Sequence, residues 1–280
     1  MVMSCTVCGT QADLEFSLKD IDLYRCSVCD HCFSDQSRVP VPERYGPEYY
    51  EVVHKHWYLH PNIHLFESIR HAISAARSVL DVGCGRGDLL KYLRTKSPNL
   101  ALTGIDLNPN QPVPGIEFIA ADFMNVDVGR QFDAVTSLAS IEHVQDARGF
   151  VRRLYDLCVP GGLVIIMTLN DRSILYKVAR ALHRIGIDGP FKRLYDKHHI
   201  NHFNLSSLRR LVTHQELSVL TTLRHNAPLA AIDFPASSWL GDRILRTGVW
   251  GTFALGRLTG MTYQQTIVSQ KGMSQKLLNG

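Results

Sequence analysis

The stretch VLDVGCGRGDLL, residues 79–90, decides the fold of this chain. An apolar run enters a turn that carries a glycine at every second position, and a helical pattern follows at once. Gly83, Gly85 and Gly87 place no side chain where a ligand would approach the backbone, and the start of the next helix offers unpaired N–H groups. The stretch therefore predicts a buried strand, a ligand-binding turn and a helix. Taken alone, it also fits a purely structural turn.

Short apolar runs alternate with helical patterns downstream of this turn. Such alternation is typical of an α/β fold with a parallel sheet built from strand-helix-strand units. We expect strands at about 78–83, 101–106, 116–120, 132–138, 162–168, 218–225 and 262–269. We expect helices from Glu51 to Arg77 and at about 87–96, 146–158 and 206–215.

An acidic residue stands at the end of the second predicted strand. Asp106 follows Gly85 by 21 residues (106 − 85), a spacing at which a carboxylate can bind both hydroxyls of a ribose. Nicotinamide cofactors and S-adenosylmethionine both contain such a ribose. The turn here reads GxGxG rather than GxGxxG, and Asp81 lies inside the strand before it. An acid at that place suits the ammonium of a methionine moiety better than a pyrophosphate.

With its acidic partner, this segment resembles the first motif of class I S-adenosylmethionine-dependent methyltransferases. Further similarities follow in order: Ala121-Asp122-Phe123 resembles the adenine-binding position, 132–144 the fourth strand with its loop, and 157–168 the turn at Pro160-Gly161-Gly162 into the fifth strand. The resemblance covers about 75–225 and implies a Rossmann-like seven-stranded sheet with helices on both faces. Transferred to this chain, the implied cofactor-binding residues are Asp81, Gly83, Cys84, Gly85, Gly87, Asp106, Leu107, Asp122, Phe123 (or its neighbour) and Ser137.

Two shorter segments narrow the resemblance. YGPEYY at 45–50 and HINHFN at 199–204 are similar to segments of a subgroup that contains ubiquinone O-methyltransferase-like and sugar-modifying enzymes, many with a cysteine-rich N-terminus. In that subgroup Tyr45, Tyr49 and Tyr50 could close the cofactor pocket, or they could simply pack on the sheet.

The cysteines at the start of the chain predict a metal site. Cys5-x2-Cys8 and Cys26-x2-Cys29 are separated by 17 residues, which matches the spacing of a four-cysteine zinc ribbon. A module of about 35 residues needs such a staple, because it is too small to stabilise itself by its core. His31 or Cys32 could replace Cys29 as the fourth ligand. A closed four-thiolate site has no open position for water, so we expect structural Zn²⁺ over residues 1–35.

Composition gives a compartment but no partner. Five of the seven cysteines fall in the first 32 residues, as expected of metal ligands where thiols stay reduced, and Cys84 and Cys158 lie in apolar runs as inert thiols. Neither a secretory signal nor an 18-residue apolar run is visible, so we expect a cytoplasmic protein without a transmembrane segment. Four thiolates on one zinc ion would offset part of the formal charge of +4, so composition alone does not indicate a polyanion partner.

Methyl transfer from a sulfonium is an in-line displacement that needs few catalytic side chains. A hydroxyl acceptor would gain from a base, and histidine suits neutral pH. His143 is the leading candidate because it follows the fourth strand, at the carboxyl edge of the sheet, although Glu142-His143 could merely brace that loop or pack on the cofactor. His199 and His202 are rival candidates on a polar, His-rich insert at about 170–204, which we expect to form part of a lid. Alternatively, those two histidines bond to backbone at an interface.

The remaining segments complete the predicted organisation. Residues 36–77 read as a linker and an N-terminal helix, and 78–280 as the methyltransferase domain with an apolar insert at about 227–261. That insert is rich in aromatic and basic residues, so it could contact a membrane surface peripherally or cover its own core. Lys and Arg exceed Asp and Glu across 170–260, which is compatible with an acidic or phosphate-bearing acceptor or with ordinary solvated surface.

The sequence thus favours a biosynthetic methyltransferase that acts on a hydroxyl or carbon of a sugar, a quinone-like molecule or a secondary metabolite. The first alternative is an RNA base methyltransferase that uses the zinc module to bind its substrate. Only Lys19, Arg25 and Arg38 could serve as phosphate partners near that module, so a nucleic acid partner is not favoured. The second alternative is a catalytically silent protein in which the zinc ribbon recruits a partner.

Overall fold

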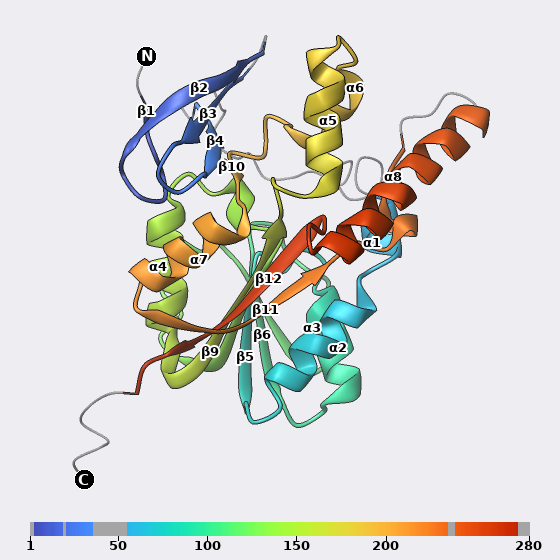
Figure 1. Cartoon of the computed structure of the whole chain (residues 1–280). Coiled ribbons are helices and arrows are strands. Elements are labelled where there is room, and N and C mark those ends of the chain that lie inside the picture. The colour runs from blue at the N-terminus through green and yellow to red at the C-terminus, as the bar shows by residue number, and fades with distance from the viewer. Residues whose placement is uncertain (1–2, 19–20, 36–54, 235–238, 274–280) are drawn as a thin grey trace.

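The computed structural model describes residues 3–18, 21–35, 55–234 and 239–273. Its centre is a seven-stranded sheet in the order β11-β12-β9-β8-β5-β6-β7, which confirms the predicted α/β class and Rossmann-like sheet (Figure 1). The strands are β5 (Ser78–Val82), β6 (Ala101–Asp106), β7 (Ile116–Ala120), β8 (Phe132–Leu138), β9 (Cys158–Leu169), β11 (Leu217–His225) and β12 (Gln264–Lys271). Strands β5 to β9 run parallel, and β12 is antiparallel to both of its neighbours.

Helices cover both faces of this sheet, as the resemblance implies. On one face α2 (Ile63–Ala72) and α3 (Asp88–Lys96) bury their leucine and isoleucine side chains against β5, β6 and β9. On the other face α4 (Ala147–Leu157) and α7 (Leu205–His214) do the same against β8 and β12. The carboxyl ends of the parallel strands β5 to β9 meet at one edge of the sheet.

The expected helix from Glu51 to Arg77 is shorter and interrupted. It consists of α1 (Lys55–Leu59) and α2, separated by a break at His60-Pro61-Asn62, and it ends before Ser74. Proline cannot donate a helical hydrogen bond, and the Asn62 side chain accepts a hydrogen bond from the Leu65 N–H to begin the second helix. Residues 36–54, with the predicted linker and Tyr45, Tyr49 and Tyr50, lie outside the described residues.

Two strand boundaries also differ from the expectation. β9 begins at Cys158, so Pro160-Gly161-Gly162 does not precede the strand but interrupts its pairing with β8. Phe132 pairs with Cys158 and Ala134 with Leu163, which leaves the proline and glycines bulged between two ladders. β12 spans Gln264–Lys271 rather than 262–269, because the residues before it turn out of helix α8.

The cysteine-rich N-terminus forms a second sheet in the order β1-β2-β3-β4-β10. Its strands are β1 (Met3–Ser4), β2 (Gln11–Ser17), β3 (Asp22–Cys26), β4 (Cys32–Ser34) and β10 (Asn201–His202). The last strand comes from the insert at 170–204, so the module and the insert share one sheet. Figure 1 shows this sheet above the large one, next to the strand ends.

The insert at 170–204 is more ordered than its polar composition indicates. It contains α5 (Ile174–Arg184) and α6 (Gly189–Leu194), which bury Tyr176 and Phe191 against Leu23 of the module. The apolar insert at 227–261 contains η4 (Leu229–Ala231) and the long helix α8 (Trp239–Thr259), and residues 235–238 lie outside the described residues. None of the described helices combines the length and apolar character needed to cross a membrane.

Candidate functional site

The glycine-rich turn takes a backbone shape that only glycine adopts without strain. Gly83, Gly85 and Gly87 have φ angles of 68°, 53° and 74°. A Cβ atom on Gly83 would lie 2.2 Å from Ser140 Oγ, and one on Gly87 would lie 2.8 Å from the Phe118 ring. Gly87 is also the N-cap residue of α3. The turn thus brings bare backbone and a helix start to the carboxyl edge of the sheet.

Asp106 ends β6 beside this turn, where the sequence placed it. One of its carboxylate oxygens accepts a hydrogen bond from the Gly85 N–H at 2.8 Å, and the other accepts one from the Asn108 N–H at 3.0 Å. Burial raises the pKa of this carboxyl, and the backbone donors work in the opposite direction. The side chain therefore lies against the turn and is held by it.

Two further carboxylates surround the turn. Asp81 is buried in β5, accepts a hydrogen bond from Thr136 Oγ1 at 2.7 Å and has its pKa raised by burial to about 7. Asp88, which the sequence analysis did not single out, begins α3, and burial raises its pKa as well. Both line the cavity beside the turn. Carboxylates that are difficult to ionise favour a cationic ligand, because a positive charge nearby stabilises their ionised form.

A cavity runs from the turn toward the insert. Its lining combines aromatic and aliphatic side chains with acids and histidines, and among the described lining residues there is no Lys or Arg. Its lining residues include Trp57, Tyr58, Asp81, Gly83, Gly85, Asp88, Glu142, His143, His199, Pro228, Ala231 and Tyr263. A site for a pyrophosphate would need cations or donors in place of these acids.

Glu142 is a site residue that the sequence analysis considered only as a brace of its loop or a contact of the cofactor. It lies in η3 (Ile141–His143), is 2% exposed and lines the cavity. Thr168 Oγ1 donates a hydrogen bond to its carboxylate at 2.8 Å, and burial raises its pKa to about 7. Its sequence context contained no signal of burial, because the packing of the insert over η3 creates it.

The structure brings His143 and His199 together at this cavity. Their ring centroids lie 4.8 Å apart, and both side chains line the cavity. His143 Nδ1 lies 2.9 Å from the carbonyl oxygen of His198. Because a carbonyl can only accept, this nitrogen carries the proton, and Nε2 is the basic nitrogen of the neutral ring.

His202 does not reach the cavity. It lies in β10 opposite Cys32, is 3% exposed, and stacks at a tilt on Tyr195 with centroids 4.7 Å apart. Burial lowers its pKa to about 3. His202 lies at the junction of module and insert, while His199 lines the cavity. The two rings remain neighbours, with centroids 6.4 Å apart, but only His199 is among the cavity-lining residues.

Six of the ten cofactor-binding residues implied by the resemblance are not among the cavity-lining residues. Gly87, Asp106 and Leu107 belong to the turn and strand end beside the cavity, whereas Asp122, Phe123 and Ser137 lie farther along the chain. Phe123 is buried against Phe150 of α4 rather than open to a ligand, which leaves its half-buried neighbour Met124 as the apolar side chain at that position. Ser137 is fully buried in β8. Asp122 is exposed after β7 and accepts hydrogen bonds from the Met124 N–H at 2.9 Å and from Asn125 at 2.5 Å.

Cys84 lies within the turn, and Leu107 follows the end of β6 beside it. Leu107 follows Asp106 and is half-buried. Cys84 lines the cavity, and burial raises the pKa of its thiol. Its sulfur lies 3.7 Å from the Asn110 side-chain nitrogen. A protonated thiol in contact with the site is a packing surface rather than a nucleophile.

The four predicted metal ligands converge in the N-terminal module. The Sγ atoms of Cys5, Cys8, Cys26 and Cys29 all lie within 4.8 Å of one another. Cys5 and Cys29 approach to 3.5 Å, and Cys8 and Cys26 to 3.4 Å, close to the ~3.8 Å between sulfurs in a tetrahedral zinc site. The donor set therefore fits Zn²⁺.

The two alternative fourth ligands point elsewhere. Cys32 is buried against Tyr195 and Leu23, outside this group. His31 is fully buried, with Nε2 at 3.2 Å from the Asn201 amide oxygen. Among the described residues the geometry thus brings Cys29, and neither His31 nor Cys32, to the other three thiols.

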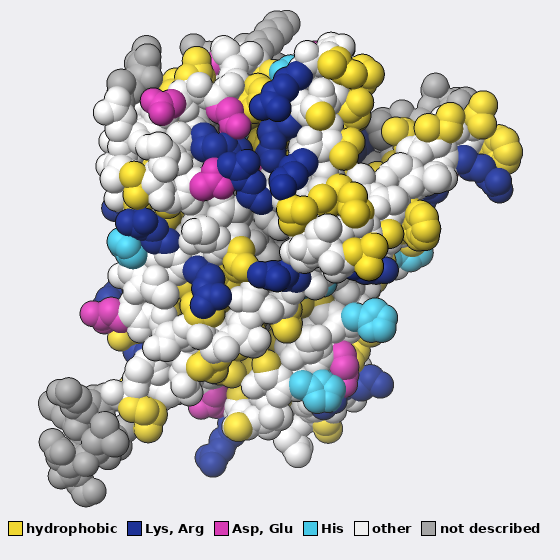
Figure 2. Space-filling model, in the orientation of Figure 1, with side chains coloured by type: hydrophobic (Ala, Val, Ile, Leu, Met, Phe, Trp, Pro, Cys, Tyr) yellow, Lys and Arg dark blue, Asp and Glu magenta, His cyan; other side chains and the backbone are white. Residues whose placement is uncertain are grey.

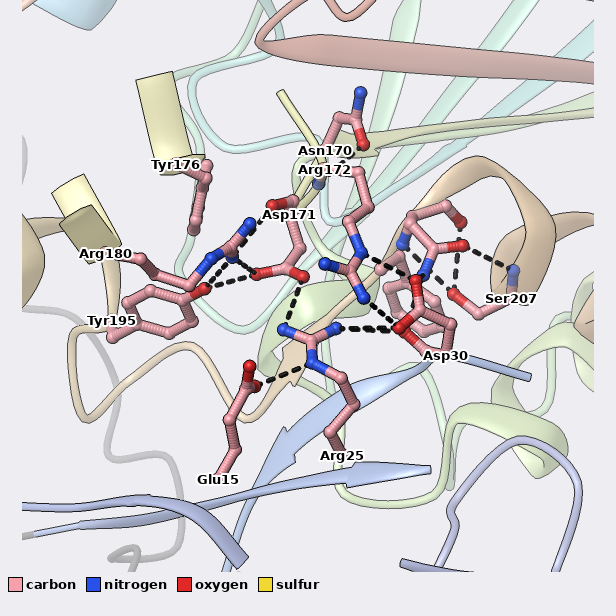
Figure 3. Close-up of polar contacts among 12 residues, drawn as sticks. Glu15, Arg25, Asp30, Asn170, Asp171, Arg172, Tyr176, Arg180, Tyr195 and Ser207 are labelled. Atoms are coloured by element: carbon pink, nitrogen blue, oxygen red, sulfur yellow. Dashed lines mark hydrogen bonds and ion pairs between the residues drawn. The ribbon is translucent and has the colours of Figure 1, made fainter. Parts of the chain in front are cut away.

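A buried ion-pair network joins the module to the insert (Figure 3). Asp171 is fully buried between Arg25 of β3, at 2.9 Å, and Arg180 of α5, at 2.9 Å, and Tyr195 donates a hydrogen bond to it. Burial alone would raise the pKa of Asp171, but the two guanidinium groups outweigh it and lower the pKa. Arg25 also pairs with Glu15, so this arginine is not available to bind a phosphate.

Asn201 connects this junction to the loop that carries Glu142 and His143. Its amide nitrogen donates to the Val144 carbonyl at 2.7 Å, while its amide oxygen accepts from Thr6 and lies next to His31. The neighbouring Ile200 N–H donates to the Glu142 carbonyl at 2.8 Å. The module, the insert and the candidate catalytic loop are therefore linked by direct hydrogen bonds.

Comparison with known proteins gives a consistent picture. A ubiquinone biosynthesis O-methyltransferase from Chromobacterium violaceum is 35% identical over 123 residues, 39% of this chain and 52% of that protein. The chain thus spans about half the length of the curated relatives it matches. The complex of the Haloferax volcanii Trm112 methyltransferase activator with a methyltransferase gives a TM-score of 0.52 at 16% identity, covering 80% of this chain and 93% of that one.

A second solved structure is the Haemonchus contortus phosphoethanolamine N-methyltransferase 2 in complex with S-adenosyl-L-methionine. It has a TM-score of 0.51 at 15% identity and covers 70% of this chain and 49% of that one. These structural similarities show the fold alone. A family model described as a methyltransferase domain matches residues 55–222, which is more than half of the 280-residue chain. This match and the curated relatives place the chain in the class I S-adenosylmethionine-dependent methyltransferase family.

Proposed function

We propose that this chain transfers a methyl group from S-adenosylmethionine to a hydroxyl or carbon of a small, uncharged, largely apolar acceptor. The observation that carries the proposal is one cavity that begins at the Gly83–Gly87 turn with Asp81 and Asp88, and continues to Glu142, His143 and His199. Ubiquinone biosynthesis O-methyltransferases among the relatives support a quinone-like or similar aromatic acceptor.

The chain's own residues fit the proposed cofactor. Glycine at 83 and 87 leaves room that a Cβ would fill, and Asp106 stands where a carboxylate can bind ribose hydroxyls. Asp81 and Asp88 would hold the cationic methionine end, and Met124 with Asp122 the adenine end. The cofactor supplies the electrophilic methyl group, so these residues act by binding and orientation.

We propose that a side chain in the loop after β8 accepts the proton that the acceptor loses during methyl transfer. In the neutral ring of His143, Nε2 is the basic nitrogen, because Nδ1 lies against the His198 carbonyl, and His199 packs against that ring. Glu142, with a pKa raised to about 7, is the second group able to take a proton near neutral pH. The aromatic walls Trp57, Tyr58 and Tyr263 would exclude water around the acceptor.

The charged side chains that line the cavity favour a particular charge on the acceptor. The excess of Lys and Arg over 170–260 fits an acidic acceptor, but none of these cations is among the described residues that line the cavity. Buried acids would repel a phosphate or carboxylate there. We therefore propose a neutral acceptor. For the cysteine module we propose structural Zn²⁺ held by Cys5, Cys8, Cys26 and Cys29.

The RNA base methyltransferase is less well supported. Arg25, the one described arginine in the module, is committed to Glu15 and Asp171, and the cavity lining carries no phosphate-binding cation among the described residues. A salt-sensitive gel shift with RNA would revive this alternative.

Calorimetry with S-adenosylmethionine tests the cofactor assignment. We expect saturable binding that Asp106→Ala weakens about tenfold or more, because a ribose contact is lost, while Asp127→Ala, an exposed acid in the β7–β8 connection, leaves it unchanged. Absence of heat at millimolar cofactor would favour the catalytically silent alternative. Incubation with labelled cofactor and extract of the native cell, followed by mass spectrometry, would identify the methylated acceptor.

A further inference from the structure

The long helix α8 turns an apolar face outward. The side packed on the protein carries Phe253 and Gly256, where the Gly256 Cβ position lies 2.7 Å from the Met261 carbonyl oxygen. At 100° per residue, Leu240, Ile244 and Leu258 fall on the opposite side, and Leu258 is 85% exposed. The outer face of α8 is defined here by Trp239, Leu240, Ile244, Trp250, Leu255 and Leu258, all of which are exposed.

Two exposed arginines lie on the same side of α8 as this outer face. Arg243 and Arg257 are exposed, and Arg243 stacks over the Trp239 ring at 4.6 Å. The single acid of α8, Asp242, is paired with Arg246 at 2.7 Å. Figure 2 shows hydrophobic side chains along α8 and over the neighbouring α5, with Lys and Arg side chains beside them. An apolar face with tryptophans and exposed arginines, whose long side chains can reach the head groups, has the composition of a helix that lies in a lipid interface.

The C-terminal half of α8 is linked by a hydrogen bond to the segment that forms one wall of the cavity. The Asn226 side chain donates to the Phe253 carbonyl at 3.1 Å, and the segment that follows, with Pro228 and Ala231, lines the cavity. The short helix η4 in that segment packs on α1, which contributes Trp57 and Tyr58 to the same cavity. A surface that α8 contacts would therefore lie close to the side of the cavity formed by α1 and η4.

We propose that the outer face of α8 docks the protein peripherally on an anionic membrane surface, from which an apolar acceptor reaches the cavity. Charge complementarity favours a membrane surface, rather than a second copy of the chain, as the partner of the outer face. In a symmetric dimer the same face would meet itself, so Arg243 and Arg257 would approach like charges. Anionic lipid head groups instead pair with these arginines while the side chains of the outer face enter the interface. The link to an apolar acceptor rests on the proposed function, but the docking does not.

Vesicle flotation tests the docking directly. We expect the full chain to float with vesicles of phosphatidylcholine mixed with phosphatidylglycerol, and the bound fraction to fall at least fivefold with phosphatidylcholine alone or at high salt. Leu240→Ser combined with Ile244→Ser and Leu258→Ser should remove binding, and Arg243→Glu with Arg257→Glu should remove it as well. The matched controls, Leu14→Ser with Leu220→Ser and Arg209→Glu, change exposed residues elsewhere and should bind like the wild type.

Tryptophan fluorescence gives a second readout. The chain has three tryptophans, and Trp57 lies at the cavity while Trp239 and Trp250 lie on the outer face. A blue shift on adding anionic vesicles should vanish in Trp239→Phe with Trp250→Phe. Absence of flotation and of the shift would overturn the proposal. So would a wild-type dimer in light scattering that the three serine substitutions convert to a monomer, because the face would then bind a second copy. Unimpaired cofactor binding in the same variants separates this result from a failure of the proposed function.

Discussion

At the scale of single residues, Asp81 makes a specific prediction about protons. Its pKa, raised by burial to about 7, leaves it mostly protonated at pH 6, and a cationic methionine moiety nearby would lower that pKa. Cofactor binding at pH 6 should therefore release close to one proton, and binding at pH 8 should release almost none. Calorimetry in buffers of different ionisation enthalpy measures this number.

Asp81→Asn is the control for that experiment, because it removes the titrating group. The release at pH 6 should then fall close to zero, even though Glu142 keeps its raised pKa of about 7. A binding enthalpy independent of the buffer in the wild type would contradict the assignment of Asp81 to the cationic end of the cofactor.

The two candidate bases can be separated by the pH dependence of the rate. If Glu142 takes the proton, kcat should rise with pH through about 7, as its carboxyl ionises, and this rise should vanish in Glu142→Gln. His143→Ala should lower turnover by roughly 10²–10⁴ while cofactor affinity stays near normal, if the imidazole is the base. His214→Ala, an exposed histidine of α7, is the matched control. Unchanged turnover in His143→Ala would remove that residue as the base.

At the scale of elements, the turn between β5 and α3 should tolerate no side chain at position 83. Gly83→Ala forces a Cβ to 2.2 Å from Ser140 Oγ at a φ of 68°, so we expect a loss of stability of about 1–3 kcal/mol and weakened cofactor binding. Thermal unfolding and calorimetry measure the two effects. Gly189→Ala, where a Cβ meets nothing within 4 Å, should change neither.

A second variant separates the two causes of that loss. Ser140→Gly added to Gly83→Ala removes the clash but not the unfavourable φ, so stability should return in part. Full tolerance of Gly83→Ala alone would show that the turn can rearrange, and the argument from its shape would fail.

The sequence predicted the elements better than their side-chain partners. Hydrophobic periodicity located β5 to β8 to within a residue, since a buried parallel strand leaves a continuous apolar run. It missed α5 and α6, because their apolar side chains bury against the cysteine module rather than the large sheet. Pro61 marks the break between α1 and α2 in the sequence. The prediction of one continuous helix gave more weight to the helical spacing of the apolar residues from Ile63 onward, and therefore missed this break.

For the candidate site, too, local sequence patterns predicted the position of residues along the chain better than their burial and contacts. Local motifs located Gly83, Asp106 and His143 at one sheet edge, because parallel strands end there. The burial of Glu142 and Phe123 depends on what packs over them, which no local pattern contains. Nor could the spacing of HINHFN tell which histidine faces the cavity, since that depends on the register of β10 against β4.

At the scale of the whole molecule, the network around Asp171 should dominate the attachment of the module. Asp171→Asn leaves the Arg25 and Arg180 guanidinium groups buried without their shared carboxylate, so we expect a loss of about 3–5 kcal/mol in the free energy of unfolding. Urea denaturation measures it. Glu67→Gln, which breaks a surface pair with Arg70, should change stability much less, because solvent screens that pair, and an equal effect of both substitutions would contradict the special role of the network.

The pairing of β10 with β4 also constrains how such a chain can be rebuilt. The N-terminal module looks like a detachable cassette in the sequence, yet its fifth strand is encoded far downstream, between α6 and α7. A chimera that exchanged residues 1–35 alone would replace four strands of a five-stranded sheet and keep the fifth. Asn201 would then lose its partners Thr6 and His31. Transfer of the module to another protein should therefore succeed only when residues 1–35 and the segment with β10 are transferred together. Recombination within the family would likewise have to keep these two segments as a pair.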